Sequence, residues 1–389
     1  MFKSVLSLTL AAALGTASFG QTTLTAIPGE AAAAKYASIS QEILRAIEKG
    51  NEYLKSKQNP EGYWAQPSYP ALTALAVTAY MRDPANQGKP VPEYIRKGYD
   101  FILKSQKEDG SIFNRGMSSY NTAVCMMAAN KEEYAPAILK GRAYLIKQQN
   151  HFAPDNPYNG GIGYGDKQAP PIADLSNTSL ALEAIYYSQK LAKDGKYGEQ
   201  PDLDWNAATE FINRCQQNPA VNKEPWVSND KSQLGGFVYR PGVSSARDKK
   251  SAAFDKAEPP KAYGSMTYAG MQSLIYANVD KNDPRVKLAL KWLENSYSLD
   301  ENPGMGVQGL YYYYQAMSKA LSAMGIDTLT LENGRKVDWR DELANKLISI
   351  QKSDGSWVNT NNRWWEADPV LVTSYCVLAL EQLYHSIPR

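Results

Sequence analysis

The sequence predicts an all-α fold, an (α/α)6 toroid in which six outer helices surround six inner helices. One short pattern recurs six times along the 389 residues, and each copy follows an amphipathic segment and precedes a weakly charged one. No stretch shows the convincing alternation of apolar and polar residues that is typical of a half-buried strand. Similarity at intervals of tens of residues indicates stacked units that bury their apolar faces against one another.

The recurring pattern is an amphipathic segment that runs into Gln, followed by a short charged turn, Gly and an aromatic residue. The clearest copies pass from Gln58, Gln106 and Gln351 to Gly62-Tyr63-Trp64, Gly110-Ser111-Ile112-Phe113 and Gly355-Ser356-Trp357. Weaker copies lead to Gly160-Gly161, Gly235-Gly236-Phe237 and Gly304-Met305-Gly306. Each turn is therefore expected to join one helix of the outer layer to one of the inner layer.

The segment before each turn is predicted to be an outer helix, because apolar residues recur at i, i+3, i+4 and i+7 between Lys, Glu and Arg. The expected outer helices cover residues 38–57, 92–104, 136–149, 204–216, 284–297 and 338–351. Ser38 and Gln41 resemble a capping box, which would start the first of them.

The segments after the turns carry few charges, so they are predicted to be inner helices that are buried on most sides. They cover residues 69–80, 119–129, 174–188, 264–277, 308–324 and 369–384. They align on a column of Thr73, Thr122, Thr178, Thr267 and Thr373, with Tyr313 in the fifth unit. This register places every inner-helix start at one end of the ring, where unpaired N–H groups and positive dipole ends favour a ligand site.

The N-terminus is predicted to be a secretory signal peptide over residues 1–20, with Lys3, an apolar run over 5–17 and small residues near the cleavage point. An uncleaved anchor is the alternative interpretation. Residues 21–37 are expected to be a linker, and 38–389 a single toroid of six repeats. We therefore expect an exported protein, periplasmic or extracellular, with no transmembrane segment after cleavage, since no other stretch approaches about 18 apolar residues.

The charge balance bears on the class of partner, and the cysteine content bears on the core. The chain has 42 Lys and Arg against 40 Asp and Glu, with no basic stripe interleaved with aromatics, so no nucleic-acid partner is expected. Three cysteines, Cys125, Cys215 and Cys376, leave at least one free thiol and are interpreted as small core residues. The oligomeric state stays open.

At its repeated turns the chain resembles the squalene-cyclase and prenyltransferase β-subunit repeat superfamily, whose members are α/α toroids marked by a Gln-…-Gly-x-Trp turn. Squalene-hopene-type cyclases carry an Asp-x-Asp-Asp-Thr stretch in which an Asp protonates the polyene. The matching stretch here is Asp174-Leu175-Ser176-Asn177-Thr178. The resemblance thus implies that cyclisation started at Ser176 is disabled, because a hydroxyl has far too high a pKa to protonate an alkene.

Zinc prenyltransferases share the predicted fold, and their metal needs an Asp, a Cys and a His that converge on it. This chain has only two histidines, His151 and His385, and no Asp-x-Cys stretch. We therefore expect no metal and no cofactor.

Tyrosine is unusually abundant, with 26 residues against 8 Phe, and several tyrosines fall where inner helices are predicted to begin. They either pack inner against outer helices or line a pocket suited to a sugar ring or a cation. Asp174 is the candidate catalytic residue, with helix capping as its alternative role, and capping is favoured for Asp368 before Pro369. The candidate ligand-binding residues are Tyr120, Asn177, Tyr263, Tyr312, Trp364 and Trp365.

Three functions remain open. The first is an exported toroid that binds an elongated or isoprenoid-like molecule in a Tyr-lined central cavity, as a ligand carrier or as a cyclase-like isomerase or transferase. The second is an exported carbohydrate-active lyase or hydrolase, and the third a non-catalytic binding or scaffold protein, favoured by the lack of a recognisable nucleophile with a base. A closed apolar cavity favours the first, open carboxylates the second, and a filled ring the third. The long charged loop over 235–261 is a candidate lid.

Overall fold

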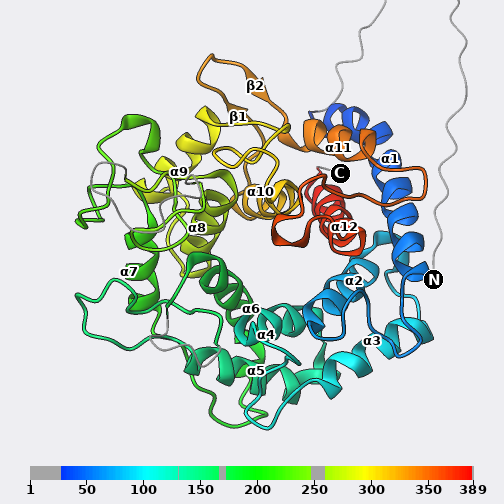
Figure 1. The fold of residues 1–389 in the computed structure, drawn as a ribbon. Helices are drawn as coiled ribbons and strands as arrows, with labels where there is room; N and C mark the ends of the chain where they lie inside the picture. The colour runs from blue at the N-terminus through cyan, green and yellow to red at the C-terminus, as the bar shows by residue number, and fades with distance from the viewer. Residues whose placement is uncertain (1–27, 130, 166–171, 247–258, 388–389) are drawn as a thin grey trace, which may run out of the picture.

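The computed structural model describes residues 28–129, 131–165, 172–246 and 259–387. Within these ranges twelve α-helices alternate between an inner and an outer layer and form one closed double ring (Figure 1). The structure therefore confirms the (α/α)6 toroid. The predicted signal peptide lies outside the described residues.

The outer layer consists of α1 (Pro28–Ser56), α3 (Glu93–Lys104), α5 (Ala135–Lys147), α7 (Trp205–Cys215), α9 (Pro284–Asn295) and α11 (Trp339–Ser349). The inner layer consists of α2 (Pro70–Arg82), α4 (Ser118–Ala128), α6 (Leu175–Lys193), α8 (Gly264–Tyr276), α10 (Leu310–Met324) and α12 (Pro369–Ser386). Each inner helix packs against the next, and α12 packs against α2, which closes the ring.

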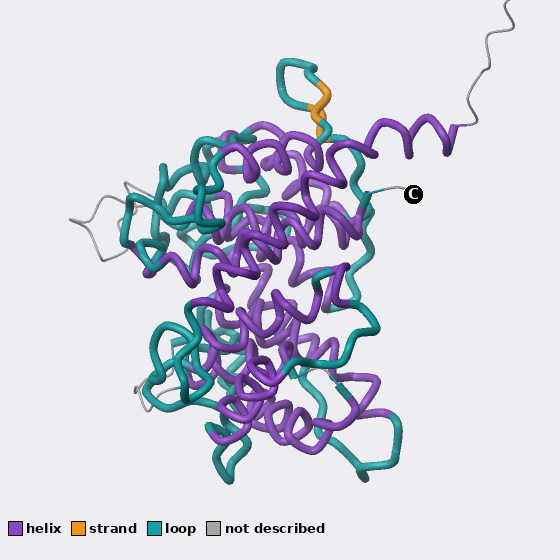
Figure 2. Tube along the Cα trace, turned by 90° about the vertical axis from the view of Figure 1, so that its right-hand side faces the viewer, coloured by secondary structure: helices purple, strands orange, loops and turns teal. Residues whose placement is uncertain are grey.

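Short elements join the helices. Strands β1 (Leu329–Thr330) and β2 (Lys336–Val337) pair antiparallel between α10 and α11 and project beyond the helices (Figure 2). Four 3-10 helices lie in loops: η1 (Pro84–Asn86), η2 (Glu132–Tyr134), η3 (Lys231–Gln233) and η4 (Arg363–Trp365). None of the described helices is both long enough and apolar enough to span a bilayer.

In five of the six units, the repeated Gln links the unit to the next one. In unit one, the Gln58 side-chain amide donates to the carbonyl of Gly62, at 2.9 Å, and to that of Tyr94 in α3, at 2.7 Å. Gln106, Gln149, Gln216 and Gln351 make the same two kinds of bond, to their own turn glycine and to the next outer helix or its N-cap. The last of these reaches Ala46 in α1, so one amide joins unit six to unit one.

The repeated Thr fixes the register between each turn and the inner helix that follows. The Trp64 backbone N–H donates to the Thr73 hydroxyl at 3.1 Å, and Trp357 donates to Thr373 at the same distance. The equivalent bonds run from Ile112, Ile162 and Phe237 to Thr122, Thr178 and Thr267. In five units, the predicted Thr is therefore the acceptor for a turn N–H that would otherwise be buried without a partner.

The expected start of the first outer helix was wrong. Helix α1 begins at Pro28, so much of the segment 21–37 that was expected to be a linker is helical. Ser38 consequently lies inside α1, where its hydroxyl contacts Glu42 at 3.4 Å instead of capping a helix. An Ala-rich stretch has high helix propensity, which is the physical reason why the helix extends this far.

Two further expectations concern the core and the helix starts. The thiols of Cys125, Cys215 and Cys376 are buried and unpaired, as expected for small core residues. Asp368 is the N-cap of α12, where its carboxylate accepts from the backbone N–H of Val370 at 2.8 Å, with Pro in the first turn.

Candidate functional site

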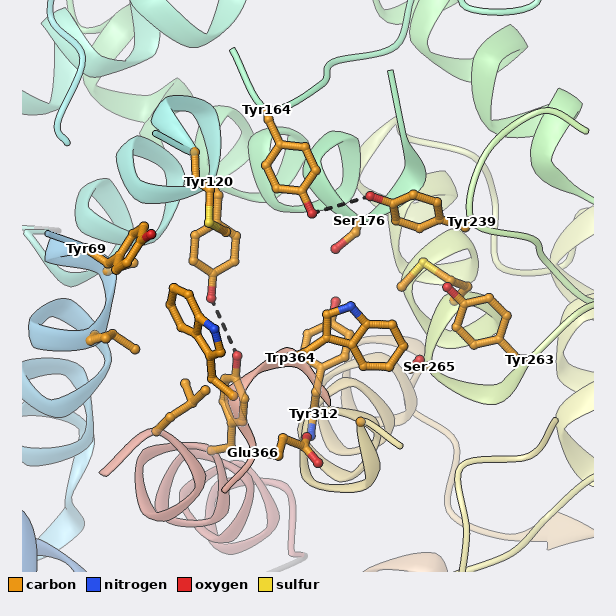
Figure 3. A pocket seen from close by; sticks show the side chains of 18 residues that line it. Tyr69, Tyr120, Tyr164, Ser176, Tyr239, Tyr263, Ser265, Tyr312, Trp364 and Glu366 are labelled. Carbon is orange, nitrogen blue, oxygen red and sulfur yellow. Dashed lines mark hydrogen bonds between the residues drawn. The ribbon is translucent and has the colours of Figure 1, made fainter. Parts of the chain in front are cut away.

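A cavity of about 520 Å³ opens at the end of the ring where the inner helices begin. Figure 3 shows aromatic side chains from different helices converging on it. Its lining consists of Tyr69, Ala71, Leu72, Met117, Tyr120, Tyr164, Ser176, Tyr239, Tyr263, Ser265, Met266, Gly309, Tyr312, Trp364, Trp365, Glu366, Leu371 and Tyr375. The volume falls within the range of roughly 300–1,000 Å³ that is typical of small-molecule sites.

Equal repeat phases place several tyrosines around this cavity. Tyr69 and Tyr263 are the N-cap residues of α2 and α8, and Tyr120 and Tyr312 lie in the first turns of α4 and α10. Because the inner helices begin at the same end of the ring, these side chains meet there. The structure therefore brings together the candidate residues Tyr120, Tyr263 and Tyr312.

The candidate pair Trp364 and Trp365 lies at the cavity mouth in η4. Both residues adopt left-handed backbone conformations, with φ of 55° and 64°, and remain 47% and 39% exposed. A non-glycine residue in this region costs about 1–3 kcal/mol, so the surrounding contacts must hold the pair in place. Trp365 packs on Tyr69, with ring centroids 4.6 Å apart, and the Arg363 guanidinium stacks on Trp364 at 4.4 Å.

Asp174 and Asn177 lie behind the cavity wall and are absent from its lining. Asp174 is the N-cap of α6, and its two carboxylate oxygens accept from the backbone and side-chain N–H groups of Asn177, each at 2.8 Å. Burial raises the pKa of Asp174 to about 6, although these hydrogen bonds and the charge of Arg240 act in the opposite direction. Asp174 thus caps α6, and it interacts with the side chain of Tyr239, which lines the cavity.

Ser176 does face the cavity, from the first turn of α6. It presents a hydroxyl to the cavity and no carboxyl. Burial also raises the pKa of the neighbouring Tyr312 far above its usual value, so that its hydroxyl stays neutral. Neither hydroxyl is an acid strong enough to protonate an alkene.

Sequence reasoning missed Glu366, the one carboxylate among the lining residues that the structure describes. Its Oε1 accepts from the Tyr312 backbone N–H at 2.8 Å, and its Oε2 accepts from the Asn359 amide at 2.6 Å. Burial raises its pKa, and the amides at the start of α10 oppose that shift. Both oxygens therefore help to anchor the Trp364–Trp365 loop. The sequence signal that could have pointed to Glu366 was its position directly after two tryptophans.

Tyr164, Tyr239 and Tyr375 also line the cavity without having been predicted. The hydroxyls of Tyr164 and Tyr239 lie 3.4 Å apart in the cavity wall (Figure 3). Tyr239 comes from the loop over 235–261, so this loop does contribute to the cavity. Residues 247–258 of the predicted lid lie outside the described residues.

The lining offers little reactive chemistry. Apart from tyrosines it holds a single ionisable group, Glu366, whose oxygens are both engaged. Among the described residues, no three His, Cys, Asp or Glu side chains gather closely enough to hold a metal ion. The site provides a concave, aromatic surface with several hydroxyl groups, and its one carboxyl group is engaged in hydrogen bonds.

No family model matches the sequence. The fold is similar to solved structures of the type II terpene cyclase MstE from Scytonema. A substituted form bound to its substrate, geranylgeranyl dihydroxybenzoate, aligns with a TM-score of 0.51 at 10% identity, over 90% of this chain and 99% of that chain. A second form, bound to the product merosterolic acid A, gives 0.51 at 9% identity, over 90% and 99%.

The apo form of MstE aligns with a TM-score of 0.50 at 11% identity, over 89% of this chain and 99% of that chain. At such low identity this similarity establishes the fold alone. The fold is therefore that of a terpenoid-cyclase-like α/α toroid, and it holds a central cavity.

Proposed function

We propose that the protein binds an elongated, isoprenoid-like small molecule in the central cavity and does not cyclise it by protonation. The observation that carries this proposal is the lining, in which tyrosines, tryptophans and methionines surround an open volume and no unengaged carboxyl faces it. Burial of apolar ligand surface in such a cavity supplies the binding free energy. The prenyl substrate and product bound by MstE, on the same fold, support this ligand class.

We further propose that the protein is of the squalene-cyclase and prenyltransferase repeat type. We also propose that it is exported. The repeated contacts support the assignment to this repeat type, because Gln, Gly and Thr each make the same hydrogen bond in successive units. The order of charged, apolar and small residues at the N-terminus supports export.

The alternatives fit the cavity less well. A scaffold protein has no need for an open volume lined by aromatics, and a glycan hydrolase or lyase needs a carboxylate or a base free to reach the sugar. Glu366 is not free in this sense, since both of its oxygens accept N–H bonds.

The test is incubation with geranylgeranyl dihydroxybenzoate, followed by gel filtration and mass spectrometry of the protein fraction. We expect this compound to co-elute with the protein at its original mass and in its original linear form. Failure to co-elute would contradict the binding function. Recovery of a cyclised isomer would contradict the claim that Ser176 leaves the site without an acid.

A further inference from the structure

The ring encloses a second, smaller cavity of about 50 Å³ further along its axis. Three tyrosines, Tyr120, Tyr312 and Tyr375, line both cavities and therefore separate them. We call these three residues the tyrosine floor. They come from α4, α10 and α12, so the floor spans the ring from three sides.

Beyond the tyrosine floor, the second cavity holds a buried ion pair among side chains that are mostly apolar. Lys319 and Glu183 form an ion pair there, with Nζ and Oε2 2.5 Å apart, beside Gln272 and Gln315. An apolar chain that passed the floor would have to displace or desolvate these groups, which costs free energy. The inner end of a ligand in the large cavity is therefore expected to stop at the floor.

The floor presents hydroxyl groups to that inner end. The hydroxyl oxygens of Tyr120 and Tyr375 lie 3.5 Å apart, whereas O–H···O bonds have a usual length of about 2.7–2.8 Å. Each hydroxyl carries one proton, so a bond between the two uses one proton and leaves the other for a third acceptor. Both side chains line the cavity, and burial raises both pKa values, so this proton stays on its oxygen.

A hydrocarbon end placed on the floor would cover these hydroxyls without offering them an acceptor. Burying a polar group without a hydrogen bond is unfavourable, whereas an oxygen at the same place would be stabilised. We propose, on the basis of the function proposed above, that the ligand is an oxygenated isoprenoid. A hydroxyl or carbonyl oxygen at its inner end would accept a hydrogen bond from the hydroxyls of Tyr120 and Tyr375.

The experiment compares geranylgeraniol with the hydrocarbon of the same chain that lacks the hydroxyl, by titration followed through tryptophan fluorescence. The variants are Tyr375→Phe and Tyr120→Phe, which keep the rings and remove the hydroxyls. Tyr187→Phe is the matched control, because Tyr187 lies in α6 outside both cavities. Unchanged melting temperatures establish that the variants fold.

We expect the wild type to bind the alcohol about 2- to 12-fold more tightly than the hydrocarbon, the worth of one net hydrogen bond. Tyr375→Phe and Tyr120→Phe should each reduce this preference by weakening binding of the alcohol, while Tyr187→Phe retains it. Equal affinity for the two probes in the wild type, or a preference that survives both floor substitutions, would overturn the inference and leave the binding function intact. Binding of neither probe would instead refute the binding function itself.

Discussion

The two carboxylate oxygens of Asp174 accept the backbone and side-chain N–H groups of Asn177, each at 2.8 Å. This pair closes the first turn of α6 behind the cavity wall. An acid that faced the ligand would instead keep at least one oxygen directed into the cavity. These two hydrogen bonds favour a structural role for Asp174 over a catalytic one, and the two roles predict different results when Asp174 is substituted.

We expect Asp174→Ala to lower the free energy of unfolding by about 0.5–2 kcal/mol, the usual worth of an N-cap, with little change in ligand affinity. The pKa of Asp174 is raised from 3.8 to about 6, so the folded state binds this proton more tightly than the unfolded state does. The stability that this raised pKa adds is therefore fully present below pH about 4 and is lost as the pH rises to about 6. Denaturant unfolding at pH 4 and pH 7 measures both effects.

The matched variant Asp174→Asn cannot titrate and still offers a capping oxygen. The pH dependence that Asp174 adds should therefore disappear in this variant. A loss of ligand binding in Asp174→Asn, without a change in stability, would show that Asp174 acts on the ligand.

The Thr column predicts a second effect on stability. Thr73→Val keeps the side-chain shape but removes the acceptor of the Trp64 N–H, which leaves a buried donor without a partner and should cost about 1–3 kcal/mol. Thr78→Val in the same helix is the control, because the Thr78 hydroxyl only donates to the Ala74 carbonyl one turn back. Similar losses from the two variants, measured by urea denaturation, would argue against the register role.

The turn glycines are required for two separable reasons. Gly62 has φ of +95°, and a Cβ there would lie 2.5 Å from the Lys97 carbonyl oxygen in α3, whereas Gly88 has φ of +74° and open space around it. Gly88→Ala should therefore cost only the left-handed backbone, about 1–2 kcal/mol. Gly62→Ala adds the clash, about 1–3 kcal/mol more, and thermal unfolding of the two variants should show this difference.

Two buried glutamates should respond with opposite sign to the same substitution. Within the described part of the chain, neither carboxylate oxygen of Glu381 has a hydrogen-bond partner, and burial raises its pKa well above 4.5. Wild-type stability is therefore lost as the pH rises above about 4.5 towards the folded-state pKa, and Glu381→Gln should stabilise the protein at pH 7. Glu366→Gln should destabilise it by about 1–3 kcal/mol, since both Glu366 oxygens accept N–H bonds.

Melting temperatures at pH 5 and pH 8 measure this contrast. A gain for Glu381→Gln that does not grow between these two values would mean that Glu381 is ionised in the folded protein.

The ring and the end of it that holds the cavity could be predicted from the sequence, because Gln, Gly and Thr make the same local contacts in five of the six units. Tyr120, Tyr263 and Tyr312 followed from that register, as the first turns of inner helices. Tyr239 could not be found this way, since it comes from a loop whose path depends on the packing between α7 and α8. Tyr375 lies deeper, in the second turn of α12, where periodicity alone does not separate a cavity residue from a core residue.

The most direct test of ligand binding is a calorimetric titration of the protein with geranylgeraniol at several temperatures, beside the variant Ser176→Trp. The indole of this variant would occupy the cavity from the first turn of α6, and Ser349→Trp in the outer helix α11 is the control. We predict saturable binding of one molecule with a negative heat-capacity change, the mark of buried apolar surface, retained in Ser349→Trp and lost in Ser176→Trp. Absence of saturable binding, or equal binding by the Ser176→Trp variant, would contradict a ligand site in the central cavity.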